Sequence, residues 1–194
     1  MAIAPLVVVL AGPNGAGKST SAAHLLRGAL AVDEFVNADT IAQGLSAYRP
    51  DAAAVTAGKV MLERLRALAS MRRDFAFETT LSGRSHARWL RELQASGYRT
   101  HLIFLSLPSA DLAVARVADR VRRGGHYVPD AVVRRRFVAG LRNLFSVYMP
   151  AVDAWNVYDN ADVVSPRLIA SRAFGVGAVV ADAEAWKSLK ELQP

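Results

Sequence analysis

The sequence predicts an α/β fold, a three-layer sandwich in which a five-stranded, mainly parallel sheet carries helices on both faces. Apolar strand-like runs alternate along the chain with stretches of helical period, which is the order typical of parallel sheets. The first run, residues 6–11, is wholly apolar, as expected for a strand that is buried on both faces. A glycine-rich segment joins this run directly to a helical stretch, and 194 residues suffice for one such domain.

The remaining elements follow from the same patterns. The expected strands are residues 6–11, 35–39, 75–80, 102–107 and 155–158. The expected helices are residues 19–30, 52–71, 85–96, 110–123 and 130–148. In the second of these helices the apolar period places Val55, Leu62, Leu65 and Ala69 inside. Beyond them, residues 167–172 and 177–181 are expected to form a hairpin, followed by a short helix near 183–192.

We interpret residues 1–194 as a single domain. Within it we expect a lid region at about 110–136 and a C-terminal appendage at about 161–194. The chain has no cysteine, which excludes a disulfide framework and a thiolate metal site and favours the cytoplasm. The run 6–11 is too short to span a bilayer and lacks the flanks of a signal peptide, so no membrane association is expected.

The charge pattern is dominated by arginine. The formal net charge is +7, with 20 Arg against 4 Lys, and seven of the arginines lie between positions 116 and 136. A guanidinium presents a fork of N–H donors that suits phosphate oxygens. Charge alone leaves nucleic acid open as a partner. However, the sequence has no basic stripe interleaved with aromatic residues and no helix-turn-helix, so nucleic acid is not the expected ligand.

The segment after the first strand is a P-loop. It has the pattern G-x-x-x-x-G-K-[ST] between a strand and a helix, and its residues are Gly12, Pro13, Asn14, Gly15, Ala16, Gly17, Lys18 and Ser19, followed by Thr20. Its glycines let successive backbone N–H groups converge on a phosphate chain, and the following helix adds the positive end of its dipole. Lys18 can reach the β- and γ-phosphates, and the Ser19 hydroxyl can ligate Mg²⁺. The segment therefore predicts binding of ATP and Mg²⁺.

Two acidic residues are expected near the carboxyl ends of the second and third strands along the chain, the edge where α/β folds place their ligands. Asp39 could accept a proton from an attacking hydroxyl or orient Mg²⁺ through water, or it could simply cap a helix. Glu78 could lie over the metal, accept from a substrate hydroxyl, or form a structural ion pair. Thr80 and Arg84 follow Glu78 and are further candidates on the substrate side.

The arginines near the double glycine 124–125 are candidates for a phosphate clamp. Arg116, Arg120 and Arg123 share one helical face, and Asp119 can pair with Arg116 or Arg123. Such a lid can bring an arginine onto the transferring phosphoryl oxygens. The candidates for this role are Arg120 and Arg123, with Arg135 or Arg136 from the second cluster. A solvated surface stripe is the alternative, and His126 is interpreted as a loop residue rather than a catalyst.

The absence of two motifs narrows the reaction. No DExx-type motif follows an apolar strand, which disfavours a motor-type ATPase, and no [NT]KxD sequence indicates guanine recognition. Transfer of phosphate to a small hydroxyl substrate is therefore favoured. The alternatives are a regulatory nucleotide-binding module without transfer, and a polynucleotide or nucleoside kinase.

Four segments together resemble the zeta-toxin family of P-loop kinases, especially its short chromosomal branch. They are GPNGAGKST at 12–20, NADTIAQGL at 37–45, FAFETTLSG at 75–83 and RVADRVRRGGHYVPDAVVRRRF at 116–137. The resemblance implies that Lys18 and Ser19 hold ATP and Mg²⁺, that Asp39 activates the acceptor hydroxyl, and that Glu78 lines the substrate side.

The resemblance also implies a phosphate acceptor and a protein partner. Arginines on either side of the double glycine would clamp the γ-phosphate. The acceptor implied is the 3′-hydroxyl of UDP-N-acetylglucosamine, and the partner implied is a small helical antitoxin. Another sugar nucleotide, a nucleoside or an antibiotic hydroxyl stays open as the acceptor.

Overall fold

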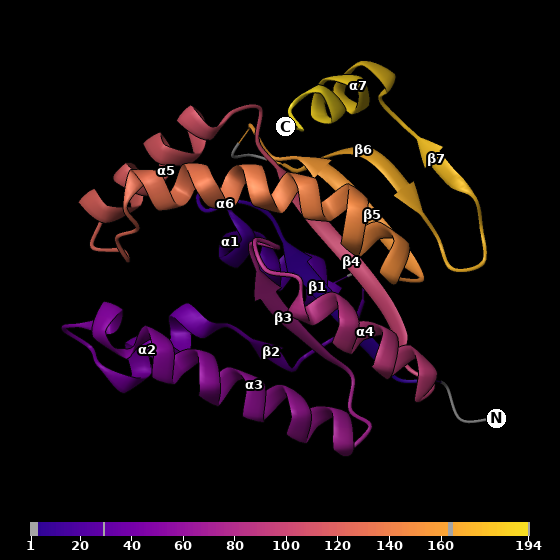
Figure 1. The fold of residues 1–194 in the computed structure, drawn as a ribbon, viewed down its shortest axis with the longest axis horizontal. Helices are drawn as coiled ribbons and strands as arrows, with labels where there is room; N and C mark the ends of the chain where they lie inside the picture. The colour runs from indigo at the N-terminus through magenta and orange to yellow at the C-terminus, as the bar shows by residue number, and fades with distance from the viewer. Residues whose placement is uncertain (1–3, 29, 163–164, 194) are drawn as a thin grey trace.

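The computed structural model describes residues 4–28, 30–162 and 165–193. In these residues a sheet of seven strands has the order β2-β3-β1-β4-β5-β6-β7. Its strands are β1 Leu6–Ala11, β2 Phe35–Val36, β3 Phe75–Thr79, β4 Arg99–Ser106, β5 Ala154–Asp159, β6 Arg167–Arg172 and β7 Ala178–Val180. The pairs among β1 to β5 are parallel, while β6 and β7 add antiparallel pairs at one edge (Figure 1). The expected α/β sandwich is confirmed.

Strand β1 lies at the centre of the parallel part of the sheet. Its six side chains are all buried, as its apolar sequence predicts. Leu10 pairs in register with Glu78 of β3 on one side and with Ile103 of β4 on the other. The carboxyl ends of these strands therefore meet at the same edge of the sheet. The segment that follows β1 begins beside Glu78.

Helices connect the parallel strands. They are α1 Lys18–Ala22, α2 Ala38–Leu45, α3 Ala54–Ser70, α4 Ser85–Ala95, α5 Ala110–Arg122, α6 Asp130–Asn143 and α7 Ala183–Glu191. Helices α1 and α6 continue into wider π-helical turns over Ala23–Gly28 and Leu144–Tyr148. Figure 1 shows α4 and α6 crossing in front of the central strands, α2 and α3 beside β2, and α7 at the β6–β7 edge.

The expected hairpin and final helix are present, and the hairpin strands β6 and β7 extend the main sheet. Strand β6 pairs antiparallel with β5, for example Val157 with Ala170. Helix α7 returns over this edge, and its Trp186 ring stacks on Trp155 of β5 with centroids 5.9 Å apart. The spacing of apolar residues indicates where a strand lies but not which strand it pairs with. The sequence therefore predicted five strands in the main sheet, whereas the described residues form seven.

Two local expectations are wrong. The second strand ends at Val36, so Asp39 lies in the first turn of α2 and not at a strand end. In α3, Leu65 is buried and Ala69 is half-buried, as expected, but Val55 is 75% exposed and Leu62 is 42% exposed. The other buried residues of this helix are Ala57, Met61 and Leu68. The expected stripe and the observed buried stripe both have helical spacing. The expectation chose the stripe that contains the larger apolar residues Val55 and Leu62. The helix instead packs a face that begins with the small residue Ala57.

Candidate active site at the P-loop

The loop between β1 and α1 has the backbone that phosphate binding requires. Gly12, Gly15 and Gly17 have φ values of 147°, 78° and 77°, which side-chain-bearing residues rarely adopt. Gly17 also serves as the N-cap of α1, so the first N–H groups of that helix face the loop. A Cβ atom on Gly12 would collide with the backbone oxygen of Leu105 in β4. The loop thus fits against the sheet only with glycine at this position.

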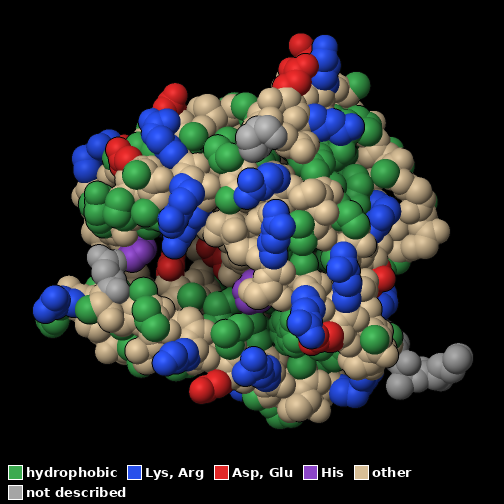
Figure 2. Space-filling view, viewed as in Figure 1, with side chains coloured by type: hydrophobic (Ala, Val, Ile, Leu, Met, Phe, Trp, Pro, Cys, Tyr) green, Lys and Arg blue, Asp and Glu red, His purple; other side chains and the backbone are tan. Residues whose placement is uncertain are grey.

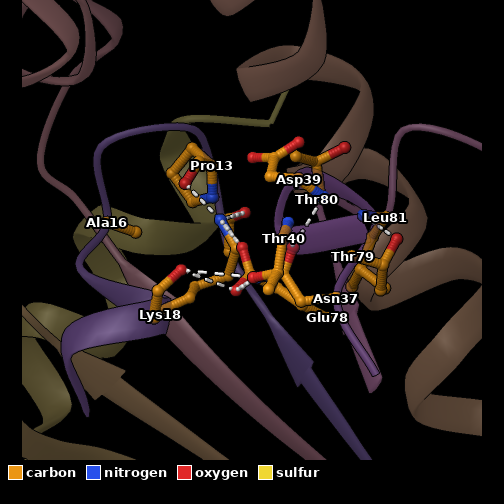
Figure 3. Close-up of polar contacts among 12 residues, drawn as sticks. Pro13, Ala16, Lys18, Asn37, Asp39, Thr40, Glu78, Thr79, Thr80 and Leu81 are labelled. Atoms are coloured by element: carbon orange, nitrogen blue, oxygen red, sulfur yellow. Dashed lines mark hydrogen bonds and ion pairs between the residues drawn. The ribbon is translucent and has the colours of Figure 1, made fainter. Parts of the chain in front are cut away.

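Lys18 turns back into the loop. Its Nζ donates to the backbone oxygens of Gly12 and Pro13, both at 2.9 Å, and lies 3.6 Å from Glu78 Oε1. Burial lowers the pKa of Lys18, although the nearby carboxylates of Glu78 and Asp39 act in the opposite direction. The ammonium is therefore held at the mouth of the P-loop, close to two negative charges (Figure 3).

Glu78 is the centre of a polar cluster. Ser19 Oγ donates to Glu78 Oε2 at 2.9 Å, and Asn37 Nδ2 donates to the same oxygen at 2.7 Å. The Glu78 side chain is only 13% exposed. Such a buried carboxylate needs partners, and Lys18, Ser19 and Asn37 provide them. The ion-pair alternative therefore describes one of several contacts that Glu78 makes.

Asp39 lies next to this cluster without joining it. Asn37 is the N-cap of α2, with Oδ1 accepting from the N–H groups of Asp39 and Thr40, so the alternative of Asp39 as the cap is wrong. The Asp39 side chain is exposed, and among the described residues its carboxylate forms no ion pair or hydrogen bond. Its charge nevertheless acts on Lys18. Asp39 is thus an unpaired carboxylate beside the P-loop.

Two arginines of α5 lie close to the P-loop. Arg116 donates to the backbone oxygens of Asn160 and Ala161 at 2.7 and 2.6 Å. Arg120 donates to the backbone oxygen of His126 at 2.7 Å, and its charge lowers the pKa of Lys18. The structure therefore brings Arg120 into electrostatic contact with the P-loop lysine.

The other candidate arginines of the expected lid region are exposed or half-buried. Helix α5 ends at Arg122, so Arg123 is its C-cap and is exposed. Asp119 pairs with Arg122, which makes the expected pairing with Arg116 or Arg123 wrong. In α6, Arg135 is exposed and Arg136 is half-buried. Arg134 forms an ion pair with Asp111 of α5 at 2.6 Å, which links α6 to α5.

The loop after β3 carries the expected substrate-side residues. Thr80 Oγ1 lies 3.0 Å from Ser82 Oγ, and Arg84 Nε donates to Asn143 Oδ1 of α6 at 3.2 Å. Asn143 is buried and donates to the backbone oxygen of Leu81 at 2.7 Å. The Tyr148 hydroxyl donates to the backbone oxygen of Gly83 at 2.7 Å, and burial raises its pKa to about 12. This loop is therefore held in one conformation by α6 and the turn after it.

Sequence reasoning missed three asparagines. Asn37 and Asn143 are described above, and Asn160 Nδ2 donates to the backbone oxygen of Ala16 at 2.6 Å, which fastens the P-loop to the end of β5. Their positions in the sequence were the only indication of a role. Asn37 precedes a helix, and Asn160 follows a strand at the edge of the sheet where ligands bind. Neither signal reveals the distant partner.

The oxygen atoms present fit a magnesium ion bound together with a nucleotide. Mg²⁺ usually takes one or two protein oxygens and completes its shell with phosphate and water. Ser19 Oγ and the Glu78 carboxylate supply such oxygens side by side. Across residues 4–28, 30–162 and 165–193, no cluster of three or more His, Cys, Asp or Glu side chains could hold a metal by itself. The site therefore suits a metal that arrives with a phosphate chain.

The space in front of this site is open. Figure 2 shows a hollow between α2–α3 and α5–α6, with acidic side chains inside it and basic side chains along its α5–α6 rim. In the part of the chain that the structure describes, no helix has the length and apolar character needed to cross a membrane.

The chain matches a known protein family over a range that includes the P-loop and Glu78. The model of the AAA domain family matches residues 7–139. An uncharacterized protein of Haemophilus influenzae is 28% identical over 126 residues, which cover 65% of this chain and 88% of that protein.

Solved structures share the fold at low identity. A chain of the AvrRxo1-ORF1:AvrRxo1-ORF2 complex with sulphate ions has a TM-score of 0.80 at 16% identity, over 99% of this chain and 65% of that one. The present chain thus spans less than two thirds of that neighbour's length. The PezAT chromosomal toxin–antitoxin system of Streptococcus pneumoniae gives a TM-score of 0.65 at 17% identity, over 99% and 79% of the two chains. These likenesses establish the P-loop kinase-like fold.

Proposed function

Because the chain belongs to the AAA domain family, we propose that it is an ATP- and Mg²⁺-dependent phosphotransferase. It transfers the γ-phosphate to a hydroxyl of a small molecule, and the proposed acceptor is a sugar nucleotide such as UDP-N-acetylglucosamine. The observation that carries this proposal is the unpaired Asp39 carboxylate, which lies beside the P-loop and acts on the buried Lys18.

The binding half of the reaction rests on the P-loop. Its backbone N–H groups and the start of α1 bind the phosphate chain, and Lys18 leaves its two carbonyl partners to contact the β- and γ-phosphates. Magnesium, when bound, neutralises phosphate charge and polarises the γ-phosphoryl group. Ser19 and Glu78 are the residues that would hold it.

The chemical half rests on Asp39 and Arg120. Asp39 accepts the proton of the acceptor hydroxyl as its oxygen attacks the γ-phosphorus, while ADP leaves with the bridging oxygen. Because the Asp39 carboxylate forms no hydrogen bond or ion pair within the described residues, its lone pairs are available for that hydroxyl. Arg120 neutralises the charge that spreads over the transferring oxygens. The half-buried Arg136 is the further candidate, whereas the exposed Arg123 contributes least.

The acceptor side suits a polar, phosphate-bearing molecule. The loop after β3 offers the hydroxyls of Thr80 and Ser82 and the guanidinium of Arg84, all held by contacts to neighbouring side chains. Hydroxyls can bind a sugar ring, and Arg84 can bind a diphosphate. A small helical antitoxin is the proposed protein partner, because one structural neighbour comes from a toxin–antitoxin system.

The test is transfer of labelled γ-phosphate from ATP to a panel of sugar nucleotides, nucleosides, aminoglycoside-type hydroxyls and oligonucleotides. Label in a sugar nucleotide is the expected result. ATP binding with no labelled product in the panel or in a metabolite extract would favour a regulatory nucleotide-binding module. Label in oligonucleotides, with steeply salt-dependent binding, would favour a polynucleotide kinase and contradict the proposal.

A further inference from the structure

Asn37 lies where three parts of the site meet. It follows β2, begins α2 and is 7% exposed. Its Oδ1 accepts from the backbone N–H groups of Asp39 at 2.7 Å and Thr40 at 3.3 Å. Its Nδ2 donates to Glu78 Oε2 at 2.7 Å and lies 3.5 Å from Ser19 Oγ. Figure 3 shows Asn37 between Glu78 and the first turn of α2.

The orientation of this amide is fixed by its partners. Flipping it would turn the NH₂ group toward two backbone N–H donors and the oxygen toward a carboxylate, and both contacts would be repulsive. Each end of the amide thus has a separate task. The oxygen fixes the backbone that carries Asp39, and the nitrogen fixes the carboxylate beside Ser19.

We propose that Asn37 is a positioning residue that couples the metal-side carboxylate Glu78 to the base Asp39. The proposal rests on the proposed function, in which Glu78 serves Mg²⁺ and Asp39 serves the acceptor. Through one rigid amide, Asn37 sets the distance between these two carboxylates. It touches neither phosphate nor acceptor itself.

A purely structural helix cap would not need asparagine. Serine and aspartate cap a helix about as well, because the cap requires only a side-chain oxygen. The donor to Glu78 is the additional feature, since serine leaves that carboxylate without this bond and aspartate places a second carboxylate against it. Outer groups that orient metal ligands typically change metal affinity 10–100-fold when they are replaced.

The variants that separate the two tasks are Asn37→Ser, Asn37→Asp and Asn37→Ala. Serine keeps the cap and loses the donor, aspartate keeps the cap and adds charge, and alanine loses both. Ser109→Ala is the matched control, because Ser109 caps α5 through Leu112 and does not contact Glu78. It shows what the loss of a cap alone does.

The first measurement is calorimetric binding of a non-hydrolysable ATP analogue with and without Mg²⁺. We expect Asn37→Ser to bind the metal-free analogue like wild type but to lose about 10–100-fold of the gain in affinity that Mg²⁺ provides. Asn37→Asp should lose more, and Ser109→Ala should lose none while melting at a lower temperature. A full Mg²⁺ gain in Asn37→Ser and Asn37→Asp, or no Mg²⁺ gain in wild type, would overturn the proposal.

The second measurement needs no nucleotide. The side-chain NH₂ resonances of Asn37, assigned by their loss in Asn37→Ser, should shift in NMR spectra of Glu78→Gln at constant pH, because the charge of their acceptor is removed, and should stay in place in Glu92→Gln. Unchanged Asn37 resonances in Glu78→Gln would contradict the coupling. Both measurements are independent of catalysis, so a protein that transfers phosphate to no acceptor would refute the proposed function while Asn37 is still tested.

Discussion

The hydroxyl of Ser19 donates a 2.9 Å hydrogen bond to Glu78 Oε2, although the two residues lie 59 positions apart. Parallel pairing explains this contact, because the register of β1 and β3 sets Leu10 opposite Glu78 just before the P-loop begins. The sheet itself therefore places a carboxylate beside the hydroxyl of the P-loop. The chemistry proposed for the site depends on this juxtaposition.

Glu78→Gln should separate metal binding from nucleotide binding. Glutamine can still accept from Ser19 and Asn37, but it removes the charge beside Lys18. We expect metal-free nucleotide affinity at or above the wild-type value, and about a 10–100-fold loss of the affinity gained from Mg²⁺. Titration calorimetry measures both. Glu92→Gln, which changes an exposed partner of Arg88, should leave both unchanged.

Arg120 and Arg123 form a matched pair on the lid. Both were candidates for the phosphate clamp, but only Arg120 acts on Lys18, while Arg123 is exposed at the end of α5. We expect Arg120→Ala to lower the rate of transfer by about 10³-fold or more, as expected for an arginine that neutralises transferring oxygens. Arg123→Ala should stay within about threefold of wild type. Equal losses in single-turnover assays would show that the lid closes differently.

Gly140 and Gly58 test the packing behind the substrate-side loop. A Cβ on Gly140 would lie 2.5 Å from the backbone oxygen of Thr80, whereas a Cβ on Gly58 in α3 would meet nothing within 4 Å. We expect Gly140→Ala to lower the free energy of unfolding by about 1–3 kcal/mol through overpacking. Gly58→Ala should raise it by about 0.5–1 kcal/mol. Urea denaturation measures both, and a neutral Gly140→Ala would mean that α6 does not approach Thr80 so closely.

The buried His101 and the half-buried His86 should make the fold sensitive to acid. Burial lowers the pKa of His86 and of His101, the latter in spite of its 2.6 Å hydrogen bond to Asn156 Oδ1. The unfolded chain binds protons near pH 6.5, before the folded protein does, so the stability contributed by the neutral rings is complete above pH 6.5 and is lost as the pH falls through the folded-state values.

His101→Gln should flatten this dependence. It keeps a side-chain amide near Asn156 but has no group that titrates in this range. The check is the urea midpoint between pH 7.5 and 5, which should fall less in the variant than in wild type. A variant with the same pH slope as wild type would show that His101 does not contribute.

The local parts of the site were accessible from the sequence. The P-loop is one contiguous motif, so Lys18 and Ser19 could be identified from their neighbours alone. The rule that parallel strands end at one edge was enough to group Glu78 with them. The general fold followed from the alternation of strands and helices, which the structure confirms.

The parts that could not be predicted depend on where elements end and on distant contacts. Helical spacing placed Arg120 and Arg123 on one face. Because the helix ends at Arg122, Arg123 lies outside it and is exposed, whereas the charge of Arg120 acts on the P-loop lysine. Asn37 and Asn160 were missed because their partners lie 41 and 144 positions away. An asparagine beside a helix or strand end is common, and only the folded chain shows what its amide contacts.

The most direct test of the account is single-turnover transfer of labelled γ-phosphate to the acceptor found in the panel, with wild type and Asp39→Asn compared at equal nucleotide saturation. Removal of a general base costs about 10²–10⁴-fold in rate. We expect Asp39→Asn to bind Mg²⁺ and the ATP analogue within about threefold of wild type and to lose at least about 10²-fold in transfer. Transfer by Asp39→Asn at the wild-type rate would contradict the account.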